Sequence, residues 1–331
     1  MENRKLFGIF AKKKEQEMGL FDDTKFRQRF VKDYNLPINI FSDDNIWAHY
    51  VRLYDFFPMV EYYRVIGLIE EEYDGNVEKW LEYCASVRDA AINGVMESSA
   101  YKFFNNMDMA PYKKLDVNIG EHSIYTEATD GKRFLSIDLR KANFQALRMM
   151  SVIEDKTYDD FILRYGGDEY IQGSKYLRHV IFGKMNPGRI IRIEKYYMNQ
   201  IYKLVNNLLE NKGMTLYSMN SDELVWASNG NTFNSQILQS FIKESLNLDT
   251  RCENVEIKML PIVNARGNKV DAFVGRNIDT GEEVLKKAST TFYPQIYKLW
   301  KGIEIEDIDR VFFCEDQLAM FNEPLKLIEN V

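Results

Sequence analysis

The order of the expected elements between residues 120 and 290 constrains the fold most strongly. Alternating or continuous apolar stretches predict strands there, and Asp, Asn and Gly residues separate them. The strands that we expect are His122–Ala128, Arg133–Leu139, Met214–Met219, Glu223–Ala227, Val255–Val263, Ala272–Ile278 and Glu283–Leu285. Helices interrupt this series, so strands far apart in the sequence must share one sheet. The sequence therefore predicts an α+β fold.

The rest of the chain is expected to be mostly helical. Apolar residues at helical spacing predict helices from Ala142 to about Ile153 and from Thr157 to Tyr165, and a long helical stretch over Tyr170–Glu210 that is interrupted at Gly183–Gly188. We expect four regions: a basic arm at 1–20, a helical N-terminal region at 21–110, a core with the strands at 111–290, and a C-terminal mixed segment at 291–331.

Asp138 is the first candidate functional residue. It lies at the end of the expected strand Arg133–Leu139, shortly before a helix. A carboxylate in this position lies at the edge of a sheet and next to a helix N-terminus. Because Asp is also a favourable N-cap, two interpretations are open, a helix cap and a catalytic or metal-binding group.

Asp222 and Glu223 form the second candidate group, in the turn between two short apolar strands. Adjacent carboxylates at a hairpin tip can both reach a hard cation, although Asn220-Ser221-Asp222 is also an ordinary turn sequence. If this hairpin neighbours the strand of Asp138, the carboxylates face each other. We then expect them to bind one or two Mg²⁺ (or Mn²⁺) ions, which activate a 3′-hydroxyl and stabilise a leaving pyrophosphate.

A basic stretch is the third feature. Residues 174–203 carry seven cations and a single acid, Glu194, so this stretch has a charge of +6 while the whole chain has −7. Lys175 and Arg178 are three residues apart and share a helix face. We expect them to bind a triphosphate or a nucleic-acid backbone, or else to belong to a partner surface. The acidic total argues against a protein that coats nucleic acid throughout, but permits one local basic channel.

Three motifs, taken in order, resemble the palm of template-directed polymerases and are closest to family B DNA polymerases. SIDLRKANF (Ser136–Phe144) resembles the motif with the first metal-binding aspartate. KYLRHVIFG (Lys175–Gly183) resembles the motif of Lys, six residues, Tyr and Gly between fingers and palm. YSMNSDELVW (Tyr217–Trp226) resembles the Asp-Thr-Asp-Ser hairpin. RNA-dependent polymerases and reverse transcriptases share this palm.

The resemblance implies a compact nucleotidyltransferase, a polymerase or primase-like enzyme, whose antiparallel palm sheet is covered by helices, with reduced fingers and a minimal thumb. The implied catalytic and metal-binding residues are Asp138, Asp222 and Glu223. The implied nucleotide-binding residues are Lys175, Arg178, Asn143, Phe182 and Gly183, and the implied nucleic-acid contacts are Lys184, Arg189, Arg192 and Lys195. The implied partners are template and primer, nucleoside triphosphates, and proteins that replace the missing thumb or exonuclease.

Two residues depart from the family pattern. Asn220 stands where family B polymerases have the first hairpin aspartate. Asn143 stands near the position where that family has a bulky Tyr or Phe that excludes a ribose 2′-hydroxyl. A small amide there predicts tolerance of ribonucleotides. The first departure and the short thumb support an alternative, a palm-derived nucleic-acid-binding or assembly subunit without polymerase activity. A different two-metal enzyme, such as a nuclease, needs more carboxylates near Asp138 than the local sequence offers.

The apolar runs, cysteines and histidines of the sequence limit where the protein is expected to be located and which metal and disulfide sites it is expected to have. No apolar run reaches the roughly 18 residues of a membrane span, and the N-terminus has no apolar signal-peptide core. Cys84, Cys252 and Cys314 show neither disulfide nor zinc spacing, and three histidines argue against a multi-histidine metal site. We therefore expect a cytoplasmic protein without membrane contact, and the compact, divergent motifs are typical of a viral or phage protein.

Overall fold

The computed structural model describes residues 23–112, 119–315 and 317–328 as a mixed α+β structure, with twelve α-helices and a six-stranded antiparallel sheet in this part of the chain. The chain divides into two compact units. The helical unit comprises residues up to 93, 159–181 and 306–321. The sheet unit comprises 94–158, 182–305 and 322 onwards. The boundaries expected from the sequence, at 110 and 290, stay predictions.

Aromatic side chains form the core of the helical unit. Its elements are α2 (Thr24–Tyr34), α3 (Asp44–Leu53), α4 (Met59–Tyr73), most of α5 (Val77–Met96), α8 (Tyr158–Arg164), α9 (Glu169–Gly173), most of α10 (Lys175–Gly183), the 3₁₀ helix η2 (Asp307–Arg310) and the hairpin of β8 (Val311–Cys314) and β9 (Gln317–Met320). Trp47, Tyr62 and Trp80 are almost completely buried. Phe26 packs against Tyr62 and Trp80, with ring centroids 5.4 and 5.6 Å away, so large rings join α2, α4 and α5.

One buried carboxylate in the helical unit is fully paired. Asp33 is inaccessible to solvent and accepts hydrogen bonds from Arg29 Nε at 2.7 Å, from Ser174 Oγ at 2.6 Å and from the Tyr170 hydroxyl. A buried carboxylate is tolerated only when its charge and lone pairs are satisfied in this way. The network therefore joins α2 to α9 and to the start of α10.

The sheet unit is built on one antiparallel sheet with the strand order β2-β3-β1-β4-β6-β7. The bounds are β1 Arg133–Leu139, β2 Met214–Met219, β3 Glu223–Ser228, β4 Thr250–Met259, β6 Phe273–Asn277 and β7 Glu283–Lys286. In chain order, β1, a helical segment, β2, β3, helix α12 and β4 follow the β-α-β-β-α-β pattern, in which β3 lies between β1 and β2. The expectation that β1 and the β2–β3 hairpin share a sheet is confirmed.

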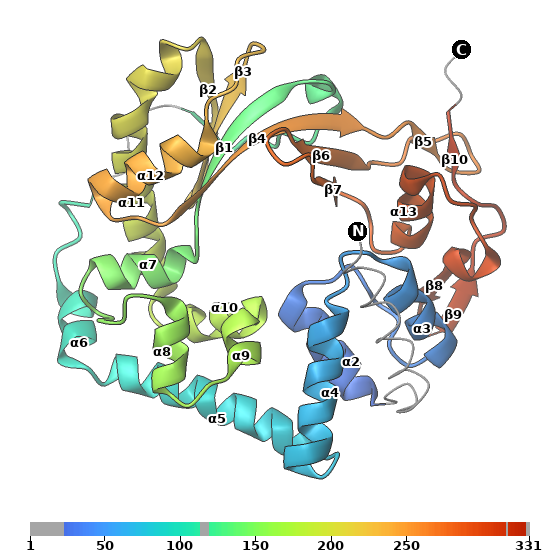
Figure 1. Cartoon of the computed structure of the whole chain (residues 1–331), viewed down its shortest axis with the longest axis horizontal. Coiled ribbons are helices and arrows are strands. Elements are labelled where there is room, and N and C mark those ends of the chain that lie inside the picture. The colour runs from blue at the N-terminus through green and yellow to red at the C-terminus, as the bar shows by residue number, and fades with distance from the viewer. Residues whose placement is uncertain (1–22, 113–118, 316, 329–331) are drawn as a thin grey trace. The chain divides into compact units, whose positions relative to one another are not determined.

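Helices α11 (Pro187–Glu210) and α12 (Ser235–Leu246) cover one face of this sheet (Figure 1), and α7 (Ala142–Met149) packs against α11. Alternate strand residues point toward them, as the two-residue period of a strand requires. Leu135, Ile137 and Leu139 of β1 join Leu224 and Trp226 of β3 in a buried core that also contains side chains from α11 and α12. The opposite face carries the intervening residues and is termed the open face.

A segment expected to be a strand is not one. Residues 122–126 form no ladder, and Glu127–Thr129 is the 3₁₀ helix η1. Its backbone is bonded to side chains instead, because His122 N–H donates to Ser218 Oγ at 2.9 Å and Thr129 Oγ1 donates to the Ile124 carbonyl at 2.6 Å. Ile124 packs on the open face against Phe134, which explains the alternating pattern without strand pairing.

The expected interruption of the long helical stretch at Gly183–Gly188 is confirmed, because α10 ends at Gly183 and α11 begins at Pro187. A further break separates α9 from α10, and β4 begins at Thr250, five residues before the expected Val255. The end of that expected strand is β5 (Ile262–Val263), which pairs with β10 (Lys326–Leu327). The remaining elements are α6 (Ser99–Asn106) and α13 (Tyr293–Lys301). In the described ranges, no helix has the length and apolar character needed to cross a membrane.

Candidate functional site

Strand register sets the three central residues of the site. In the antiparallel pairing of β1 with β3, Asp138 stands directly opposite Glu223, and in the pairing with β4 it stands opposite Arg251. Residues paired in this way have Cβ atoms about 4.5–5.5 Å apart, and two like charges directly opposite each other destabilise a sheet. A row of Glu223, Asp138 and Arg251 thus crosses the open face at the end of β1.

A second polar row lies one step along the strands. Ser136 shares the open face with Asp138 and donates a hydrogen bond from Oγ to Glu223 Oε1 at 2.6 Å. On the other side, Glu253 Oε2 lies 3.4 Å from Arg251 Nε and forms an ion pair with it. Glu223 and Glu253, the carboxylates on the two strands beside β1, are therefore each held by a neighbouring side chain.

The hairpin tip is fixed by Asn220. Its Oδ1 accepts hydrogen bonds from the backbone N–H groups of Asp222 at 3.0 Å and Glu223 at 2.7 Å. The carbonyl of Asp222 accepts from Leu139 N–H at 2.8 Å, which joins the tip to the end of β1. Asn220 is thus the residue that shapes the turn.

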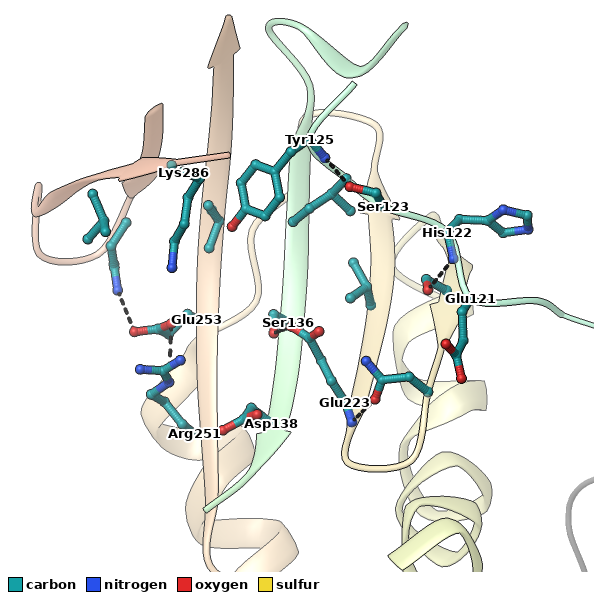
Figure 2. Close-up of a pocket in the computed structure, with 18 of the residues that line it drawn as sticks. Glu121, His122, Ser123, Tyr125, Ser136, Asp138, Glu223, Arg251, Glu253 and Lys286 are labelled. Carbon is teal, nitrogen blue, oxygen red and sulfur yellow. Dashed lines mark hydrogen bonds and ion pairs between the residues drawn. The ribbon is translucent and has the colours of Figure 1, made fainter. Parts of the chain in front are cut away.

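These side chains line a cavity of about 580 Å³ on the open face (Figure 2). The sheet supplies one wall, and residues 121–125 supply another. Glu121 and Glu223 lie on the β3 side, whereas Arg251, Glu253 and Lys286 lie on the β4 side, where Glu253 is paired with Arg251. Asp138 lies between them, and Asp222 is not among the lining residues.

Burial and neighbouring charges perturb Asp138. Burial is the larger cause and raises the pKa of its carboxyl to about 6, while Arg251 acts in the opposite direction and Asp222, Glu223 and Glu253 raise it further. A carboxyl with a pKa this close to neutrality, in a polar cavity and beside other carboxylates, is a common property of functional sites.

Glu194 is a buried carboxylate that the sequence interpretation missed, and it does not line the cavity. It is 2% exposed on α11, and its Oε1 accepts a hydrogen bond from Asn143 Nδ2 of α7 at 2.5 Å. Burial, and then the charge of Asp222, raise the pKa of Glu194 to about 7. The sequence signal for it is that Glu194 is the one acid in a basic stretch of 30 residues. This signal is easily missed, because an isolated charge of opposite sign is readily interpreted as an incidental ion-pair partner.

The helix-cap interpretation of Asp138 is wrong. The N-cap of α7 is Lys141, which has a left-handed backbone with φ of 49°. Two residues separate Asp138 from that N-cap. Its position is set by the strand ladder rather than by the helix.

The expected basic residues are distributed over both units. Lys175 and Arg178 belong to the helical unit. In the sheet unit, Phe182 is buried against Phe144 and Tyr158, while Gly183 and Lys184 are exposed and Lys195 is half-buried. Arg189 donates to the carbonyls of Phe104 and Met107, and Arg192 donates to that of Tyr112. These two arginines hold the chain after α6, and their contact with nucleic acid stays a prediction.

The donor set at the hairpin consists of carboxylate oxygens, which suit hard divalent cations. Within the described ranges, no group of three or more His, Cys, Asp or Glu side chains gathers closely enough to hold a metal ion by itself. Comparisons with protein-family models, with curated proteins and with solved structures found no match for this chain.

Proposed function

We propose that the sheet unit is the palm of a compact nucleotidyltransferase, a polymerase or primase-like enzyme that adds nucleotides from triphosphates. The observation that carries the proposal is the strand register that places Asp138 opposite Glu223, with Asp222 at the adjoining hairpin tip. The resemblance of three motifs to the polymerase palm implied this juxtaposition of β1 with an acidic hairpin. The β-α-β-β-α-β order and a cavity on the open face are further support.

The carboxylates fit Mg²⁺ or Mn²⁺ as shared ligands. Mg²⁺ in nucleotide enzymes is commonly held by one or two carboxylates together with substrate phosphates, so a complete protein cage is not required. Asp138 and Glu223 are the residues that would hold the ion, with Asp222 beside them. When bound, such ions activate a 3′-hydroxyl and stabilise the charge of the leaving pyrophosphate.

The chain's own residues prepare this site. Ser136 orients the Glu223 carboxylate, and Asn220 fixes the turn that carries Asp222. Glu194 holds the Asn143 amide nitrogen, which leaves the amide oxygen as an acceptor for a sugar hydroxyl. A small amide held in this way is consistent with the use of ribonucleotides.

The test is nucleotide incorporation on primed and unprimed templates, with ribo- and deoxyribonucleoside triphosphates supplied separately. We expect Asp138→Ala and Asp222→Ala to abolish incorporation. Asp271→Ala is the matched control, because Asp271 is exposed in the same unit and does not line the cavity. Incorporation that survives both site substitutions would contradict the proposal.

One specific observation favours a second function, a palm-derived nucleic-acid-binding or assembly subunit without polymerase activity. Asn220 uses its side chain to close the turn, where the polymerase family supplies a metal-binding aspartate. Calorimetric titration with Mg²⁺, with and without a nucleoside triphosphate, separates the two functions. A folded chain that binds neither the ion nor the triphosphate would favour the subunit.

A further inference from the structure

One side of the cavity carries two cations that none of the polymerase-like motifs includes. Arg251 on β4 and Lys286 on β7 both line it, together with Glu253 and Glu282. Asn277 also lines it, and its amide nitrogen donates to Glu253 Oε1 at 3.4 Å. In Figure 2, the Lys286 side chain extends along the cavity in the direction of Glu253 and Arg251. Two cations thus lie on one side of the cavity, next to Glu253 and across from Glu223.

Strand pairing fixes Arg251 close to the acidic row. It is the cross-strand partner of Asp138, and its charge lowers the Asp138 pKa, opposing the larger effect of burial. Its ion pair with Glu253 engages Nε at 3.4 Å, and 55% of the side-chain surface is still exposed. Because a guanidinium carries five N–H donors, four further donors remain for a ligand.

Phosphate is the ligand chemistry that suits this arrangement. A guanidinium donates two parallel hydrogen bonds to phosphate oxygens, and a lysine beside it adds a compact second charge. A polyphosphate chain could then extend from Asp138 and Glu223, where divalent ions are expected, to Arg251 and Lys286. The cavity of about 580 Å³ is within the usual size range of small-molecule sites.

We propose that Arg251 and Lys286 bind the polyphosphate chain of the nucleotide substrate. This inference rests on the proposed function for the identity of the substrate, but the phosphate contact itself does not. It assigns phosphate binding to two residues of the sheet unit, whereas the sequence motifs assigned it to Lys175 and Arg178.

The experiment is calorimetric titration of the full chain with inorganic tripolyphosphate, first in EDTA and then with Mg²⁺. A nucleoside triphosphate is titrated in parallel. We expect Arg251→Gln to weaken tripolyphosphate binding about tenfold or more, because it removes a charge-assisted bidentate contact. Arg251→Lys, which keeps the charge but loses the fork, and Lys286→Gln should each weaken it less.

Arg276→Gln is the matched control, because Arg276 is an exposed arginine of neighbouring β6 that does not line the cavity. Equal affinities of the unmodified chain, Arg251→Gln and Lys286→Gln for tripolyphosphate would overturn the inference, and so would a lack of saturable binding by the unmodified chain. Tighter Mn²⁺ binding by Arg251→Gln with unchanged tripolyphosphate affinity would also overturn it, because Arg251 would then be only a counter-ion for Asp138.

The same variants distinguish this inference from the function on which it rests. If tripolyphosphate binding depends on Arg251 but no nucleotide is incorporated, the phosphate site stands and the polymerase proposal fails. If incorporation occurs and is insensitive to Arg251→Gln and Lys286→Gln at limiting triphosphate, the polymerase proposal stands and this inference fails.

Discussion

The two faces of the six-stranded sheet contrast strongly, although the same strands make both. On the helix-covered face, Ile137 and Leu139 are buried in an apolar core with Trp226. On the open face, Ser136 and Asp138 alternate with them and line a polar cavity. The covered face therefore stabilises the fold, whereas the open face carries charges that the fold alone does not need.

A second contrast lies between two buried or half-buried carboxylates. Asp33 in the helical unit is surrounded by three donors. Asp138 in the sheet unit stands between Glu223 and Arg251 on the neighbouring strands, and its pKa is raised although Arg251 acts to lower it. The first arrangement is what stability requires, and the second is costly unless a bound cation or substrate compensates it.

Asp138→Asn should have the largest effect on function and should not destabilise the fold. We expect nucleotide incorporation to fall about a thousandfold, since metal-assisted charge stabilisation supplies several kcal/mol to the transition state. The free energy of unfolding, measured with urea, should be unchanged or higher because one of two facing carboxylates is removed. A large loss of stability would break the contrast between the two faces.

Ile137→Ala, one residue away on the covered face, should have the reverse effect. Removing a buried branched side chain leaves a cavity and costs about 2–5 kcal/mol of unfolding free energy. Urea denaturation followed by circular dichroism measures this cost. Activity per folded molecule should be retained below the transition, and its loss would show that the covered face also shapes the site.

The pH dependence of the free energy of unfolding should reveal the raised pKa values of the Asp138 and Glu194 carboxyls. Burial raises the pKa of Asp138 to about 6 and of Glu194 to about 7, from ordinary values of 3.8 and 4.5. The folded chain therefore binds these protons more tightly than the unfolded chain, so stability should fall as the pH rises from about 4 to about 7. Thermal unfolding of Glu194→Gln across this range should show a shallower fall than the unmodified chain, and an identical slope would contradict the assignment.

Ser136→Ala should have the smallest effect of the four substitutions. It removes the hydrogen bond that orients Glu223 and costs about 1 kcal/mol of stability or less. Activity should fall about tenfold, the lower range for residues that position a metal ligand. Ser136→Thr, which keeps the hydroxyl, should restore part of the activity if orientation is the cause.

Local sequence patterns predicted the covered face better than the open face. The strands of Ile137 and Trp226 were expected at nearly their observed bounds because their alternating apolar residues are a direct signal for burial. Residues 122–128 misled the same reasoning, since side-chain hydrogen bonds to the backbone replace the ladder there.

The site itself was predictable only in part. The pairing of the Asp138 strand with the Asp222–Glu223 hairpin was expected from motif order. Arg251 and Glu194 were not expected, because their positions depend on β4 pairing with β1 and on the buried face of α11. Such contacts are set by strand register and helix packing, and short motifs contain neither.

Mn²⁺ binding followed by electron paramagnetic resonance tests the central claim most directly, that the row at Asp138 is a divalent-cation site. The full chain is titrated at pH 7.5 in the presence of a nucleoside triphosphate, beside Asp138→Asn, Glu223→Gln and the exposed control Asp271→Asn. We predict saturable binding by the unmodified chain and the control, with binding lost in both site variants. Binding that is equal in all four proteins, or absent from the unmodified chain, would contradict the account.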